Sequence, residues 1–202
     1  MQRNVLPTLV ILCLISTSLD ATPKGTHRQN EQRSFSVEQE LVPIEKPSHL
    51  PKEALRVLAK EAGVASCLEN ENLSIDQLPS SWFVASVIHL DGPNEIDFVI
   101  LPNLGSEPQH HPGPAACFLG ANTGQFWIIR KTRTGYELAL TFFAHGLGIL
   151  DSRSNGLRDI EAGTDSVHGQ TTTLFKFNGE QYKLYSEKNE NNAPQPNKRQ
   201  GG

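Results

Sequence analysis

Eight segments rich in β-branched and aromatic residues follow one another between residues 81 and 187, and they constrain the fold more than any other feature. They are residues 81–90, 95–102, 125–132, 136–144, 146–152, 157–163, 171–177 and 181–187. Such a series predicts consecutive β-strands. Most connections are only a few residues long, so neighbouring strands are expected to run antiparallel. The first two segments are apolar on both faces and are expected to be central strands. Residues 136–142 alternate apolar and polar side chains instead, as in a sheet with one wet face.

One helix is expected ahead of these strands. Pro51 suits its first turn and Gly63 its end. An apolar stripe at the i, i+3, i+4 and i+7 spacing lies between them, formed by Leu55, Leu58, Ala59 and Ala62. The predicted fold class is therefore α+β, with one helix packed on a twisted antiparallel β-meander of about 7–8 strands, part of which can curl toward a barrel. The chain has neither a glycine-rich phosphate loop between a strand and a helix nor a G-x-S-x-G elbow, which excludes the commonest α/β enzyme classes.

The first 21 residues have the layout of a secretory signal peptide. Arg3 precedes an apolar run over residues 5–15, and small and polar residues follow. The run is shorter than the roughly 20 residues that span a bilayer. Cleavage after Ser18 or Ala21 is therefore expected, with an uncleaved anchor as the alternative. The mature chain is then expected to be secreted or periplasmic in a bacterium, without a stable membrane anchor.

Three regions are expected beyond the signal peptide, residues 1–21. Residues 22–49 are polar and interrupted by prolines, which predicts a flexible tether whose residues 35–44 can dock as a short edge strand. Residues 50–187 are expected to form a single α+β domain. Residues 188–202 are expected to be a disordered tail.

The mature chain keeps two cysteines, Cys67 and Cys117. An even pair in an exported protein predicts a disulfide bond, because export compartments are oxidising. Closing a loop of about 50 residues would stabilise the fold by roughly 4 kcal/mol in the chain-entropy model. Two separate buried cysteines are the alternative. Neither cysteine lies in a C-x-x-C pair, and two thiols alone do not make a structural zinc site.

Composition and local motifs disfavour nucleic acid, metals and cofactors. The formal net charge is −4, so no phosphate-neutralising excess of cations is expected. Residues 91–97 offer oxygen ligands for calcium, but their spacing departs from the D-x-D-x-D-G ladder and a plain hairpin turn is favoured. His110 and His111 are adjacent, so their rings point opposite ways on an extended chain, and an exposed loop is favoured over a metal site. No catalytic residue and no cofactor is predicted, because the serines lack a family signature.

Asn-Gly pairs at residues 155–156 and 178–179 favour type I′ turns, because both central residues of that turn need positive φ. Arg158, Asp159 and Glu161 lie just past the first pair. The favoured interpretation is a sheet corner, with Arg158 in a rim ion pair that contributes under about 1 kcal/mol. Asp159 and Glu161 are two apart on a strand and hence on one face, so a general acid–base pair and a ligand contact are the alternatives.

Aromatic residues outnumber those that one helix can cover. Phe126 and Trp127 face opposite sides of one strand, so one of them can reach solvent and form a platform for a sugar or a protein, flanked by cations. A core on both faces of the sheet is the favoured interpretation, and the platform is the alternative. The proline-stiffened loop at residues 106–116 is expected to dock with little loss of entropy. The predicted ligand- or partner-binding residues are therefore His110, His111, Trp127, Arg130 and Arg158, with Lys131 and Arg133 beside the platform.

Three short motifs lie within residues 117–185: W-x-x-R-K at 127–131, N-G-L-R-D-I at 155–160 and F-x-F-N-G-x-x-Y at 175–182. In these motifs the chain resembles secreted bacterial proteins of unassigned function. More loosely, the turn–strand pattern is similar to single blades of FG-GAP and integrin-like repeats. Those repeats recur several times and carry Asp-rich calcium loops, which this sequence lacks. The resemblance therefore implies export and sheet structure, and it implies neither a propeller nor an activity.

These features together predict a monomeric, secreted or periplasmic bacterial binding protein whose partner is a protein or an envelope polymer. One form of this prediction is an inhibitor of a secreted or envelope hydrolase, with the loop at residues 106–116 inserted in the cleft of its target. The alternatives are an envelope hydrolase whose active site is not identified from the sequence, and a structural or stress-related envelope factor without catalytic activity.

Overall fold

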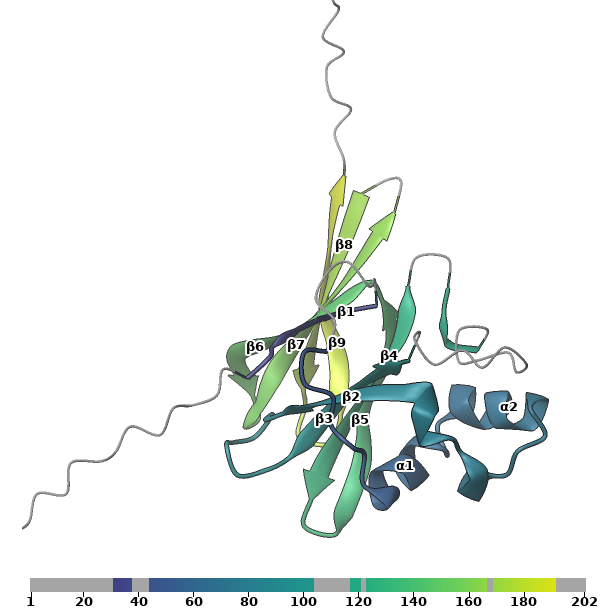
Figure 1. Ribbon diagram of the computed structural model, residues 1–202. Helices are drawn as coiled ribbons and strands as arrows, with labels where there is room; N and C mark the ends of the chain where they lie inside the picture. The colour runs from purple at the N-terminus through teal and green to yellow at the C-terminus, as the bar shows by residue number, and fades with distance from the viewer. Residues whose placement is uncertain (1–30, 38–43, 104–116, 121–122, 167–168, 192–202) are drawn as a thin grey trace, which may run out of the picture.

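The computed structural model describes residues 31–37, 44–103, 117–120, 123–166 and 169–191. These residues form two antiparallel sheets and two α-helices (Figure 1). The four-stranded sheet has the order β2 (Phe83–Ile88), β3 (Asp97–Pro102), β4 (Gly124–Thr132), β5 (Gly135–Ala144). The five-stranded sheet has the order β1 (Ser34–Ser36), β6 (Gly146–Ser154), β7 (Leu157–Ser166), β8 (Gly169–Phe177), β9 (Tyr182–Asn191). The α+β class predicted from the sequence is confirmed.

The meander is divided between two sheets at a single residue. His145 alone separates β5 from β6, and the chain passes there from one sheet to the other. Consequently β6 pairs with β1 and β7 rather than with β5. Within the described residues the two sheets stay separate, so the expectation that part of the meander curls toward a barrel is wrong.

The four-stranded sheet is the middle layer of the molecule. In β4, Phe126 and Ile128 point into a core shared with the five-stranded sheet, whereas Trp127 and Ile129 point into a second core under the helices. All four side chains are fully buried. The two-sided burial expected for residues 81–90 and 95–102 is therefore present in this sheet, and β3 is buried along its whole length.

Two helices cover the other face of that sheet, where a single helix was predicted (Figure 1). Helix α1 spans Lys52–Leu58 and helix α2 spans Ala62–Asn70, and two 3₁₀ turns follow at Ile75–Gln77 and Ser80–Trp82. The break comes at Glu61, whose carboxylate accepts a hydrogen bond from the Val64 N–H at 3.0 Å and so caps α2. Ala62, expected on the apolar face, is exposed as a result.

Gly63 lies in the first turn of α2 instead of ending a helix. A Cβ at this position would lie 3.1 Å from the Glu61 carboxylate and 3.3 Å from the Gln125 side chain. The glycine therefore permits the close approach of α2 to β4. It does not act as a stop signal here.

Cys67 of α2 and Cys117 have their Sγ atoms 2.00 Å apart, the distance of a disulfide bond. The predicted pairing is confirmed, and it is compatible with an oxidising compartment. The bond ties the helical layer to the chain just ahead of β4. In the described part of the chain, no helix has both the length and the apolar character needed to cross a membrane.

The two Asn-Gly turns differ. Asn155 and Gly156 have φ of 47° and 88°, as the predicted type I′ turn requires. Gly179 has φ of 109°, but Asn178 is not at positive φ, so the second turn is not of type I′. There the Asn178 Oδ1 accepts hydrogen bonds from the backbone N–H groups of Glu180 and Gln181, at 2.9 Å each. These bonds hold a wider loop between β8 and β9.

Both ends of the expected domain are longer than predicted. Inside the expected tether the predicted edge strand is present as β1, which is shorter than residues 35–44 and begins one residue earlier; it pairs with the edge of β6 and buries Phe35 in the core between the sheets. At the other end β9 continues to Asn191, beyond the boundary expected at residue 187. The rest of the expected tail and residues 1–30 lie outside the described residues.

Candidate functional site

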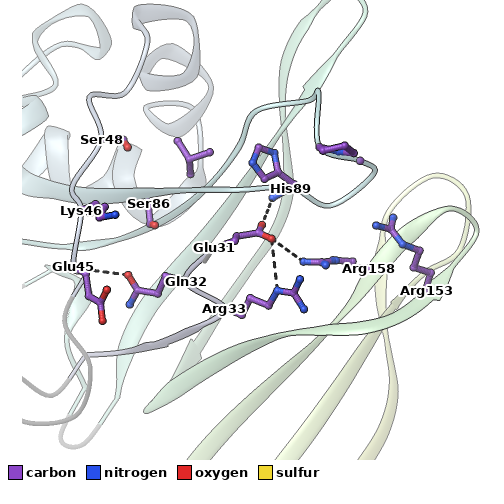
Figure 2. A pocket seen from close by; sticks show the side chains of 13 residues that line it. Glu31, Gln32, Arg33, Glu45, Lys46, Ser48, Ser86, His89, Arg153 and Arg158 are labelled. Atoms are coloured by element: carbon purple, nitrogen blue, oxygen red, sulfur yellow. Dashed lines mark hydrogen bonds and ion pairs between the residues drawn. The ribbon is translucent and has the colours of Figure 1, made fainter. Parts of the chain in front are cut away.

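A cavity of about 970 Å³ lies between the N-terminal segment around β1, the β2–β3 connection and the β6–β7 hairpin (Figure 2). Four cationic side chains and two carboxylates line it. They are Arg33, Lys46, Arg153 and Arg158, and Glu31 and Glu45. Segments from far apart in the sequence thus bring an excess of positive charge to one place, although the whole chain is acidic.

Arg158 is held at the floor of the cavity by its own backbone. Its N–H donates to the Leu90 carbonyl at 3.0 Å, and its carbonyl accepts from the Tyr182 hydroxyl at 2.6 Å. The residue is only 9% exposed. Its Nη1 lies 3.1 Å from Glu31 Oε2 and its Nη2 lies 3.3 Å from Asp151 Oδ1. Arg158 was predicted to form an ion pair at the rim, but its pair with Glu31 is largely buried. Removing one partner of a buried pair is strongly destabilising, because it leaves the other charge buried without compensation.

Glu31 sits at the centre of these cations (Figure 2). Its Oε1 accepts from the backbone N–H of His89 at 2.7 Å, and its Oε2 lies 3.1 Å from Arg158 Nη1 and 3.6 Å from Arg33 Nε. The side chain is 16% exposed. A backbone donor and two guanidinium groups together form a site shaped for a carboxylate, because charged hydrogen bonds of this kind are the strong ones.

Arg153 carries a positive charge that no described carboxylate neutralises. Its Nη1 donates to three backbone carbonyls: Leu90 at 2.8 Å, Gly156 at 2.8 Å and Asp91 at 3.3 Å. These bonds fix the guanidinium at the cavity without pairing its charge. Among the residues that the structure describes, neither Arg153 nor Lys46 makes an ion pair.

His89 closes one side of the cavity. Its Nδ1 lies 2.6 Å from the Glu95 carbonyl, so the neutral ring is assigned as the tautomer that donates from Nδ1. The Nε2 of that tautomer is an acceptor. A ligand hydroxyl or amide that reached the ring would therefore meet an acceptor next to the cationic floor.

Of the predicted partner-binding residues, the structure places Arg158 in this cavity. Trp127 is fully buried and donates from Nε1 to Glu61 Oε2 at 3.3 Å, so its ring belongs to the core and not to a surface platform. Arg130 pairs with Glu137 at 2.7 Å and lies over the Phe177 ring, away from the cavity lining. His110 and His111 lie outside the described residues.

The two acids beyond the first Asn-Gly turn do not share a site. Asp159 is buried and accepts from the Ser152 hydroxyl at 2.7 Å, whereas Glu161 is exposed. Neither lines the cavity. The sheet-corner interpretation therefore describes their placement better than a general acid–base pair, which would need both carboxyl groups at one substrate.

Asp97, considered above as a calcium ligand, is turned inward. It is fully buried, and its two oxygens accept from the backbone N–H groups of Leu90 and Lys131, each at 2.8 Å. Burial raises the pKa of this carboxyl to about 6. No group of three or more potential metal ligands occurs in the described part of the chain.

Most of the cavity's charged residues were not anticipated from the sequence. Glu31, Arg33 and Lys46 lay in the expected tether, and nothing local marks them. Arg153 and Arg158 could have been found, because a two-residue turn at 155–156 places them directly opposite each other, as they are in the structure. Like charges opposite each other destabilise a sheet unless other groups compensate. In the structure Glu31 and Asp151 compensate the charge of Arg158, and three backbone carbonyls accept from Arg153.

No protein-family model, curated protein or solved structure matches the chain. What the cavity binds is therefore inferred from its own contacts.

Proposed function

We propose that the chain is an exported bacterial binding protein that takes an anionic group of its partner in the arginine-lined cavity. One observation carries this proposal: Arg153 and Arg158 face each other across β6 and β7 at the same cavity. The free energy of folding would favour a neutral or oppositely charged pair at this register. Glu31 and Asp151 already pair with Arg158, so an anion that binds in the cavity would neutralise the charge of Arg153.

The surroundings of the pair favour the same ligand chemistry. A cavity of about 970 Å³ is within the size range of small-molecule and peptide side-chain sites. Cations at a recess with protein walls raise the local concentration of anions. Guanidinium groups match the geometry of carboxylate and phosphate, and Ser48 and Ser86 in the lining can add hydrogen bonds to either.

Export is part of the proposal because the predicted signal peptide and the cysteine pair support it together. The partner is then a protein or polymer of the envelope or of the medium. The inhibitor form depends on residues 106–116, which lie outside the described residues, and it stays a prediction. So do the envelope hydrolase and the structural or stress factor.

The proposal is tested by calorimetric titration of the full chain with citrate and with inorganic phosphate at low ionic strength. Arg153→Gln should weaken binding by about tenfold or more, because it removes the unneutralised cation from the cavity. Arg133→Gln is the matched control, since Arg133 is an exposed arginine on the β4–β5 turn outside the lining. The two probes separate carboxylate from phosphate recognition. Equal loss in both variants would indicate a general charge effect and contradict the proposal, as would the absence of binding to the wild-type chain.

A further inference from the structure

One wall of the cavity is formed by the chain's own N-terminal segment, residues 31–36: residues 31–33 line the cavity and residues 34–36 lie against the edge of β6. Ser34, Phe35 and Ser36 pair with Gly148, Leu147 and Gly146. The ladder is extended on one side by the Ile149 N–H, which donates to the Arg33 carbonyl at 2.8 Å. The segment is therefore bound as an added edge strand.

Side chains of the segment fill separate subsites. Glu31 enters the carboxylate site made by Arg158 and the His89 N–H. Arg33 pairs with Asp151 on β6. Phe35 is 2% exposed and packs in the core between the sheets. A main-chain ladder with side-chain subsites along it is the arrangement by which sheet edges recognise extended peptides.

The segment is also the least firmly paired strand of its sheet. β1 has three paired residues, whereas β6 to β9 each have nine or ten residues. Short edge elements with few backbone hydrogen bonds open at lower free energy than central strands. Arg33 would leave with the segment, but Arg158 of β7 and the His89 N–H of the β2–β3 connection, which also hold Glu31, would remain.

We infer that residues 31–36 are a built-in competitor and that the partner is an extended acidic peptide of another protein, which displaces them. Its pattern is E-x-x-x-F, with the glutamate at Arg158 and the aromatic residue in the position of Phe35. This inference rests on the proposed function, because it names the partner of the same cavity. The wild-type chain binds such a peptide weakly, since only the fraction with its own segment released is competent.

The test uses a fluorescent peptide of sequence EQRSFSV, residues 31–37 of this chain, titrated against the full chain with anisotropy as the readout. Glu31→Gln should bind it at least about tenfold more tightly than wild type, because the internal segment has lost the two ion pairs of Glu31 while Arg158 is intact. Glu45→Gln is the matched control. It makes the same change of charge in the same cavity, and the Glu45 carboxylate is not the one held by Arg158. The peptide QQRSFSV should bind neither variant.

Each outcome has a distinct meaning. Equal gains in Glu31→Gln and Glu45→Gln would show a general charge effect and overturn the inference. If citrate binds the wild-type chain but the peptide binds no variant, the inference fails and the proposed function stands. If neither probe binds, both fail. A dimer of Glu31→Gln in sedimentation, formed in place of peptide capture, would show exchange of the segment between copies and overturn the assignment of another protein as the partner.

Discussion

Asp97 is expected to make the stability of the fold depend on pH in an unusual direction. The carboxyl is fully buried, and burial raises its pKa from 3.8 to about 6. The folded state therefore binds this proton more tightly than the unfolded state does. The resulting stabilisation is fully present below about pH 4 and is lost as the pH rises through about 6. A difference of roughly two pKa units corresponds to about 3 kcal/mol.

The perturbation that reveals this effect is Asp97→Asn, because the amide stays neutral across the range. In absolute terms the variant should be less stable, since its NH₂ group must face one of the two backbone N–H groups that Asp97 now accepts from. A mismatch of this kind costs about 1–3 kcal/mol. The diagnostic quantity is the difference in unfolding free energy between wild type and variant.

Urea denaturation at a series of pH values between 4 and 7.5 measures that difference. It should shift in favour of Asp97→Asn by up to about 3 kcal/mol as the pH rises, because only the wild type acquires a buried charge. Far-UV circular dichroism of the variant at each pH shows that the same fold is compared. A difference that stays constant from pH 4 to pH 7.5 would refute the reasoning.

Three further predictions concern the scaffold. Replacing both Cys67 and Cys117 by serine should lower the unfolding free energy by about 4 kcal/mol in urea titrations, and a count of two free thiols in the native exported protein would contradict the bond. Gly156→Val and Gly179→Val should each cost about 1–2 kcal/mol, since φ is 88° and 109° there; unchanged melting temperatures would contradict the turn geometry. Trp127→Phe should cost about 1–3 kcal/mol, because the carboxylate that caps α2 loses a buried donor, and a variant as stable as wild type would show that this bond contributes nothing.

The strands could be located from the sequence because each is a local pattern. The expected residues 125–132 and 136–144 differ from β4 and β5 by a single residue at one end. The division into two sheets could not be read in the same way. His145 looks like part of one more hairpin, and alternation along a strand does not say which neighbour the strand pairs with.

The prediction of a single helix was wrong for a related reason. Nothing local marks a break after Leu58, since neither glycine nor proline lies between it and Glu61. Glu61 is not one of the usual capping residues, and its carboxylate is held in place partly by Trp127, far along the chain. A helix boundary set by a long-range contact leaves no signal in the local sequence.

Only the part of the candidate site that lies on the β6–β7 hairpin could be predicted from the sequence. The register of a two-residue turn places Arg153 opposite Arg158, and that much is contained in residues 153–158. The remaining charges come from residues 31–33 and 45–46, part of a segment that is anchored by Phe35 in the core and by the pairing of β1 with β6. A segment that is polar and rich in proline resembles a tether unless its single aromatic residue is recognised as an anchor.

The fully buried strand β3 also determines which positions of the sequence can change. Every residue of β3 is buried, so a scan of substitutions along it should show no alternation between tolerant and intolerant positions. Beyond Tyr182, by contrast, the described side chains of β9 are exposed, and substitutions there should be accepted almost without preference. Descendants of this chain would then keep a nearly constant inner sheet while the outer sheet diversified around it. Altered binding preferences would arise on the outer sheet and its edges, because substitutions there leave the packing of the inner sheet unchanged.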